Sequence, residues 1–172
     1  FHTRPTATEP QERLRIQSGG GISFNGDTAA ANALSDYEEG SFTPTIRANL
    51  NTNGSADGTG SYVKVGKKVT IHVNIGNKTL TSFPASGGAI RIDGLPFNAN
   101  PAVGDEFGIS SKCIIMGVDN NSNNVYFRTD TNQAYVYGYY NQDGSTWAYH
   151  NSSFYDNSGV YVIFNMTYFT NS

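Results

Sequence analysis

Apolar and polar side chains alternate along most of this chain with a period of two residues. In the cleanest such run, residues 69–75, four Val and Ile side chains alternate with three polar ones, His72 among them. This period predicts a β-strand with one buried face and with His72 on the outward side. A second apolar run, residues 62–65, is separated from the first by a Gly-Lys-Lys sequence. The two runs together predict a β-hairpin.

Further segments with a strand pattern follow one another along the rest of the chain. They are residues 13–17, 22–24, 42–47, 89–92, 106–118, 125–128, 133–140, 145–150 and 159–170. Pro44 has no backbone N–H to donate, so segment 42–47 is expected to be an edge strand or a bulged one. Only residues 28–34 favour a helix, and for so short a segment an irregular linker is an equal alternative. The pattern predicts an all-β protein built as an antiparallel, jelly-roll-like β-sandwich.

Composition agrees with this fold class and narrows the range of partners. The 172 residues include 19 Gly, 11 Tyr and 10 Phe, which suit strands joined by tight turns. The 11 Lys and Arg against 14 Asp and Glu leave a net charge of -3, whereas nucleic acids and anionic membranes attract clustered positive charge. We therefore expect no nucleic-acid partner and no membrane insertion, and the low charge favours a neutral or zwitterionic sugar as ligand. The single cysteine excludes an intrachain disulfide and a zinc site built on several thiolates.

Two segments carry a family resemblance. The first, residues 12–26, contains ERLRI, a serine with three glycines, and ISFNG. The second is LSDYEEGSFTPT at residues 34–45, which is followed by YVKVG at 62–66, the alternating strand, and GLPF at 94–97. In this order the motifs resemble the end of the shaft and the C-terminal domain of bacteriophage tail fibres and related virion proteins.

The resemblance implies a homotrimer on the virion, continued upstream of Phe1 by the rest of a fibre, whose distal head meets the host cell surface. It implies two parts: the end of the shaft with a linker (residues 1–34), and a β-sandwich head (residues 35–172). A lone short hairpin is marginal in water, so three copies around one axis would bury its apolar side chains. The alternative is that this segment is a disordered tail. The proposed trimer residues of the stalk are Leu14, Ile16, Ile22 and Phe24.

Residues able to support catalysis or metal binding are present without a pattern that joins them. Cys113 has the apolar neighbours of an inert core thiol. Residues 119–123 imitate the start of a calcium loop but lack its glycine and its bidentate glutamate. We expect no catalytic residues, no metal and no cofactor. Carboxylates that a glycosidase pair would need are Asp36, Glu38, Glu39, Asp105 and Glu106, with no spacing that pairs them.

The strongest candidate for a binding surface is the aromatic segment 132–157. On a strand, alternate tyrosines of residues 135–139 share one face, and flat aromatic rings stack against the C–H faces of sugars while amides and carboxylates bind hydroxyls. The candidate ligand-binding residues are Tyr135, Tyr137, Tyr139, Trp147, Tyr149, Asn132, Asn141 and Asp143. Three outcomes stay open for this face: exposure as a binding platform, burial in the core, or burial between protomers.

These observations predict a receptor-binding head that attaches the virion to a host cell-surface glycan, such as lipopolysaccharide, without covalent chemistry. Weak sites on three heads would combine through their high effective concentration. The first alternative is a structural knob that registers and caps the trimer, and the second is a polysaccharide depolymerase. Loops 49–60 and 119–124 are rival contact regions, since exposed connections often carry recognition.

Overall fold

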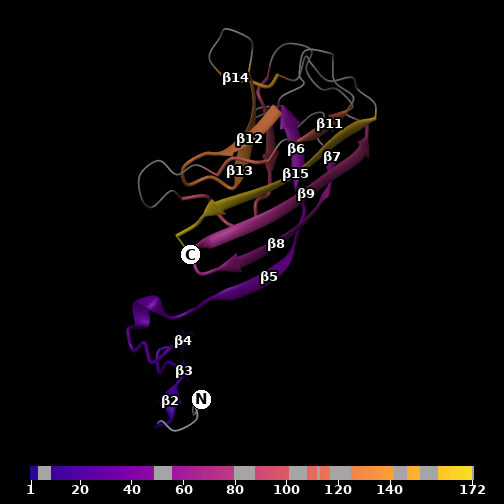
Figure 1. The fold of residues 1–172 in the computed structure, drawn as a ribbon. Coiled ribbons are helices and arrows are strands. Elements are labelled where there is room, and N and C mark those ends of the chain that lie inside the picture. Colours follow the sequence, from indigo (N-terminus) through magenta and orange to yellow (C-terminus); the bar gives the residue numbers. More distant parts are fainter. Residues whose placement is uncertain are drawn as a thin grey trace. The chain divides into compact units, whose positions relative to one another are not determined.

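A computed structural model describes residues 1–3, 9–48, 56–79, 88–100, 108–111, 113–116, 125–141, 147–151 and 159–171. The chain divides into two units. The smaller unit is Phe1–Glu38 with Lys64–Gly66, and the larger is Glu39–Val63 with Lys67–Ser172. The larger unit is an all-β antiparallel sandwich of two sheets (Figure 1), so the predicted fold class is confirmed.

The first sheet has the strand order β12-β13-β10-β6-β7, and β14 also pairs with β13. Its strands are β6 (Thr45–Ala48), β7 (Ala56–Asp57), β10 (Ile90–Asp93), β12 (Val125–Thr129), β13 (Tyr135–Tyr140) and β14 (Ala148–Tyr149). The second sheet has the order β11-β15-β9-β8-β5. Its strands are β5 (Tyr37–Phe42), β8 (Thr59–Val65), β9 (Lys68–Lys78), β11 (Ile114–Met116) and β15 (Val160–Phe169).

The strand predictions with the clearest alternation are confirmed. The run at 69–75 lies within β9, which neighbours β8 as the predicted hairpin requires and pairs with β15 on its other side. Figure 1 shows β9 and β15 side by side along most of their length. The segment 106–118 differs, because its described part forms only β11 and isolated bridges at Ile109 and Ser110.

The prediction of a single strand over residues 42–47 is wrong. The chain leaves the second sheet at the end of β5, passes Thr43 and Pro44, and enters the first sheet as β6. Because Pro44 cannot donate to a strand ladder, it stands where the chain changes sheets. Its carbonyl is still used, accepting a hydrogen bond of 2.8 Å from the backbone N–H of Gly58.

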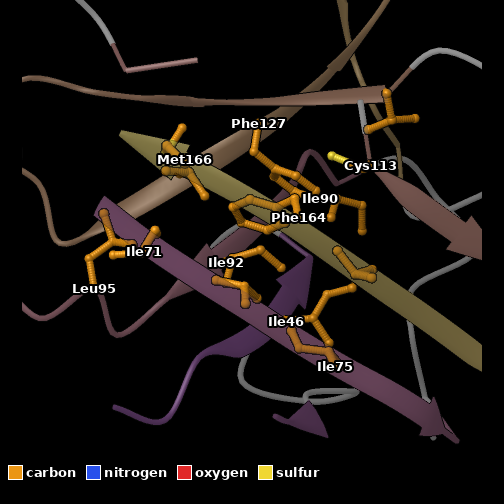
Figure 2. Close-up of a cluster of buried hydrophobic side chains, with 14 of the residues drawn as sticks. Ile46, Ile71, Ile75, Ile90, Ile92, Leu95, Cys113, Phe127, Phe164 and Met166 are labelled. Atoms are coloured by element: carbon orange, nitrogen blue, oxygen red, sulfur yellow. The ribbon is translucent and has the colours of Figure 1, made fainter. Parts of the chain in front are cut away.

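The core lies between the two sheets and is filled by the inward residues of their longest strands. Phe127 of β12 and Phe164 of β15 stack across the interface, with ring centroids 4.6 Å apart (Figure 2). Ile46, Ile90 and Ile92 from the first sheet are fully buried, as is Ile75 from the second. This face-to-face packing of alternating side chains is what holds a sandwich together.

The smaller unit consists of two short antiparallel pairs, β1 with β2 and β3 with β4. Its elements are β1 (His2–Thr3), β2 (Gln11–Glu12), β3 (Leu14–Ile16), β4 (Ile22–Phe24) and the 3-10 helix η1 (Ala30–Asn32). Residues 28–34 are therefore mostly irregular, with a single tight turn. Asp27 holds that turn by accepting hydrogen bonds from the Ala29 N–H and the Asn32 side chain, both at 2.8 Å.

One face of the β3–β4 hairpin is apolar and open. Leu14 lies opposite Phe24, Ile16 lies opposite Ile22, and Leu34 bridges to Ile22, which puts all five side chains on the same face. Ile16 is 76% exposed, Phe24 52% and Leu34 46%. The opposite face is polar and self-contained.

Ser23, buried on that polar face, accepts a hydrogen bond of 2.9 Å from the Gln17 side chain. Arg15, opposite Ser23 in the register, forms an ion pair with Glu12. The hairpin thus hides its polar face and leaves its apolar face exposed.

Candidate binding face

In the described part of the aromatic segment, the small side chains of β13 face the core and the tyrosine side chains face outward. Val136 and Gly138 of β13 are buried against the core, whereas Tyr135, Tyr137 and Tyr139 lie on the outer face with half-buried rings. Trp147 and Tyr149 continue this face and are 53% and 52% exposed. Of the three outcomes left open by the sequence, burial of the tyrosine face in the core is excluded.

The outer aromatic side chains form a row across three neighbouring strands. Tyr126 of β12 lies opposite Tyr139 of β13, which in turn lies opposite Tyr149 of β14. Trp147 packs on Tyr126, with ring centroids 5.5 Å apart. We call Tyr126, Tyr139, Tyr149 and Trp147 the aromatic row. Tyr126, Tyr139 and Tyr149 stand on paired strands, so their spacing is set by the hydrogen bonds of the sheet, and Trp147 directly precedes β14.

Ring contacts connect this row to the other two positions of β13. The Tyr149 ring lies 4.8 Å from that of Tyr139 and 5.3 Å from that of Tyr137, which meets Tyr135 edge-on at 5.2 Å. Burial, and then a hydrogen bond shared with Tyr149, raise the pKa of Tyr139 above its usual value. The Tyr139 phenol therefore stays neutral near pH 7 and offers a hydroxyl group at the surface.

Beside the aromatic row, the same face carries a row of arginines. Arg128 of β12 and Arg91 of β10 both lie opposite Tyr137, on its two sides, and Arg91 lies opposite Arg47 of β6. Asp93 of β10 holds two of them: its carboxylate is 2.7 Å from Arg91 Nε and 3.0 Å from Arg47 Nε. We call Arg47, Arg91 and Arg128 the arginine row.

The guanidinium groups of Arg128 and Arg91, on the two strands that flank β13, each lie over a tyrosine ring. Arg128 Cζ is 5.8 Å from the centre of the Tyr139 ring, and Arg91 Cζ is 4.8 Å from that of Tyr135. Such cation–π contacts stabilise a side chain over an aromatic face. They direct Arg128 toward the aromatic row and Arg91 away from it.

Of the three polar residues predicted beside the platform, one lies close to Tyr139 and the aromatic row. Asn141 follows β13 directly at the end near Tyr139 and is exposed. Asn132 lies before the opposite end of β13, in a hollow of about 330 Å3 with Phe97 and Asn100, and its Oδ1 accepts a hydrogen bond of 3.2 Å from the Asn100 side chain. Asn132 stands three residues before Tyr135, at the end of β13 away from Tyr139, and its role in binding stays a prediction. Asp143 lies outside the described residues.

A second hollow, of about 540 Å3, lies over the outer face of the other sheet. Its lining includes Glu39, Tyr62, His72 and Asn165. His72 is exposed, as its place in the alternation predicts, and its Nδ1 is 2.9 Å from Asn165 Oδ1. A second polar contact on this face joins the Thr70 and Thr167 hydroxyl oxygens at 3.1 Å.

The groups considered for catalysis are used in structural contacts where they are described. Asp36 pairs with Lys64, and burial raises the pKa of the Cys113 thiol to about 11. Asp105, Glu106 and the calcium-like loop 119–124 lie outside the described residues, as does the larger part of loop 49–60. Within the parts of the chain that the structure describes, no three His, Cys, Asp or Glu side chains gather so as to hold a metal ion.

Comparisons with known proteins add no family: no family model matches the chain, and no curated protein matches it. Among the described residues, the chain has no helix with the length and apolar character needed to cross a bilayer.

Sequence reasoning missed Tyr126 and the arginine row. Tyr126 and Arg128 alternate with buried Val125 and Phe127, so their outward direction was readable from the period of two. Their place beside Tyr139 and Tyr137 depends on the strand order β12-β13-β10, which pattern alone does not determine.

Proposed function

We propose that this chain is the host-binding end of a bacteriophage tail fibre and that the aromatic row binds a glycan of the cell surface. One observation carries the binding proposal: an outward row of four aromatic side chains, three of them on paired strands, that the sandwich core leaves partly exposed. Rings in this position present flat apolar faces with polar tips, the combination that sugar rings require. Attachment is by non-covalent contact and needs no turnover of the glycan.

Trp147 makes the proposal directly measurable, because it is the single tryptophan of the chain and belongs to the row. Stacking of a sugar on this ring will shift or quench its fluorescence emission. We would titrate the full chain against bacterial surface polysaccharides while following this emission. A saturable change supports the proposal.

The matching variants are Trp147→Ala and Tyr149→Ala, each tested for retention of the protein on polysaccharide-coated sensors. We expect a loss of binding of at least about tenfold for each, in the range of a lost aromatic stack. Tyr37→Ala is the control, because Tyr37 is 63% exposed but lies in the smaller unit. Unchanged binding by both platform variants would remove the aromatic row as the site.

The second candidate function is trimerisation, and the open apolar face of the β3–β4 hairpin favours it. Leu14, Ile16, Ile22 and Phe24, together with Leu34, expose a contiguous apolar surface on two very short strands. Three copies of the chain placed around one axis would cover these side chains and hide the strand edges. The head would then act on the virion as one end of a symmetric fibre, and three weak glycan sites would add up to firm attachment.

Light scattering coupled to size exclusion tests this part separately. We expect a mass three times the 18.6 kDa of the chain. Ile16→Glu should shift the mass to that of one chain, whereas Val63→Glu, a charge at a 41% exposed apolar position of the larger unit, should not. A monomeric unmodified chain would contradict the trimer and leave the glycan site untouched.

A further inference from the structure

On the outer face of the first sheet, aromatic, arginine and carboxylate side chains follow one another in successive rows. Next to the aromatic row comes the arginine row, and beyond the arginine row come carboxylates. Asp93 lies opposite Tyr135, and Thr45, opposite Asp93, donates a hydrogen bond of 2.6 Å to Asp57. Asp130, which is exposed, follows Arg128 by two residues, and its charge helps to raise the pKa of both Tyr135 and Tyr139.

Of these charged side chains, the guanidinium of Arg128 is the one placed over a ring of the aromatic row. Arg47 and Arg91 are both bound to Asp93 and turned toward the acidic side. Arg128 is turned the other way, over Tyr139. The net charge of -3, which favours a neutral sugar, is a property of the whole chain, whereas a bound group responds to charges within about 10 Å.

We propose that the aromatic row binds an acidic saccharide, one whose ring carries a carboxylate, and that Arg128 pairs with that carboxylate while the sugar ring stacks on the row. The inference rests on the proposed glycan-binding function and specifies its ligand class. A guanidinium forms paired hydrogen bonds with a carboxylate in one plane. The hydroxyl of Tyr137, between Arg128 and Arg91, supplies a further donor on the same side.

Arg128 is suited to this role by its position. It stands on β12 between buried Phe127 and Thr129, so its backbone is fixed in the sheet. Its side chain is half-buried over a tyrosine, which lowers the conformational entropy lost when it binds an anion.

The test compares matched polymers that differ only in charge. Polygalacturonate, hyaluronan and polysialic acid are each bound to the full chain before and after reduction of their carboxylates to alcohols, with Trp147 emission as the readout. We expect at least one acidic polymer to bind about tenfold tighter than its reduced form. Arg128→Gln should abolish that difference, and Lys68→Gln should preserve it, because Lys68 is exposed on the other sheet and its loss changes the net charge equally.

The outcomes separate this inference from the function on which it rests. Equal binding of acidic and reduced polymers, lost in Trp147→Ala, overturns the acidic ligand and keeps the glycan site. Equal weakening by Arg128→Gln and Lys68→Gln also overturns it, because attraction is then due to overall charge. If no acidic polymer binds but neutral polysaccharides do, the inference is again wrong. If no polysaccharide of either kind alters Trp147 emission, both proposals fall.

Discussion

The ammonium group of Lys64 donates a hydrogen bond to the carboxylate of Asp36, which lies 28 residues earlier in the chain. The side chain of Lys64 is 3% exposed and that of Asp36 is 50% exposed. The backbone N–H of Gly66 reaches the same place, 3.2 Å from the Ser35 carbonyl and 3.1 Å from that of Asp36. The pair therefore joins the LSDYEEG and YVKVG motifs, which the sequence shows only as separate segments.

The first prediction concerns this pair. Asp36→Asn keeps a residue that tolerates the observed φ of 58° but removes the negative charge beside a buried ammonium. We expect the free energy of unfolding to fall by about 2 kcal/mol, the range for a hydrogen bond to a charged group. Urea titration of the full chain measures it.

Lys64→Met provides the comparison. It removes the buried charge together with its need for a partner, so it should cost less than Asp36→Asn. A larger loss in Lys64→Met would contradict this account of the pair and assign its importance to the packing of the lysine stem.

The second prediction concerns Gly94 of the GLPF motif. Its φ is +84°, and a Cβ there would lie 2.6 Å from the Thr43 carbonyl oxygen. Gly94→Ala adds a backbone clash to the cost of an unfavourable φ, so we expect a loss of unfolding free energy above about 2 kcal/mol. Thermal or urea unfolding provides the measurement.

Gly159→Ala separates the two effects. Gly159 has a φ of +68°, and a Cβ there would meet nothing within 4 Å. Gly159→Ala should lower the free energy of unfolding by about 1 kcal/mol, from the backbone conformation alone. Equal losses at both positions would show that the approach to Thr43 is harmless.

The third prediction is a loss of stability in acid caused by His150. Burial lowers the pKa of this fully buried side chain from 6.5 to about 4. In the unfolded chain His150 therefore binds a proton below pH 6.5, whereas in the folded chain it binds one only near pH 4 and below. Stability from this group is complete above pH 6.5 and is lost as the pH falls toward 4, by about 3 kcal/mol.

The measurement is the free energy of unfolding by urea near pH 7.5 and near pH 4.5, for the unmodified chain and for His150→Gln. Because carboxylates also titrate in this range, the difference between the two proteins isolates the histidine. The same pH dependence in both would show that His150 does not cause it.

The fourth prediction concerns the thiol of Cys113. With its pKa raised to about 11 by burial, the thiolate near pH 8 is rarer than in an unfolded chain by a factor of about 200. We expect iodoacetamide to modify it at least that much more slowly in the native protein than in urea, as followed by mass spectrometry. Comparable rates in the two conditions would indicate that the structure around Cys113 opens readily.

The motifs that carry the resemblance also meet in the larger unit. A Cβ added at Gly40 would be 2.9 Å from the Tyr62 ring, so the backbone of Gly40 packs directly on that ring. Tyr62 in turn meets Phe97 edge-on, with ring centroids 5.4 Å apart. The hydroxyl of Tyr168 donates to the Phe97 carbonyl at 3.1 Å. Gly40, Tyr62 and Phe97, one residue from each of three motifs, thus belong to one packed region of the larger unit.

The sequence by itself determined the all-β class, the long hairpin of β8 and β9, the outward direction of His72, and that Tyr135, Tyr137 and Tyr139 share one face of their strand. These follow from a period of two, which depends only on neighbouring residues and on which side of a strand can be buried. Pro44 also indicated an edge or bulged strand, since its missing N–H is a local property, but the sequence did not predict that the chain changes sheets there.

Only the tertiary structure decided which of the two faces of β13 meets the core, that β5 and β6 belong to different sheets, and that Arg128, Tyr137, Arg91 and Arg47 form a row. Either face of β13 could be buried, because one is apolar by small side chains and the other by aromatic rings. The choice rests on the room left between the sheets, where Gly138 lies close to Phe127 and His150. The arginine row depends on a strand order in which β10 and β12 flank β13, and such pairing is fixed by packing between residues far apart in the chain.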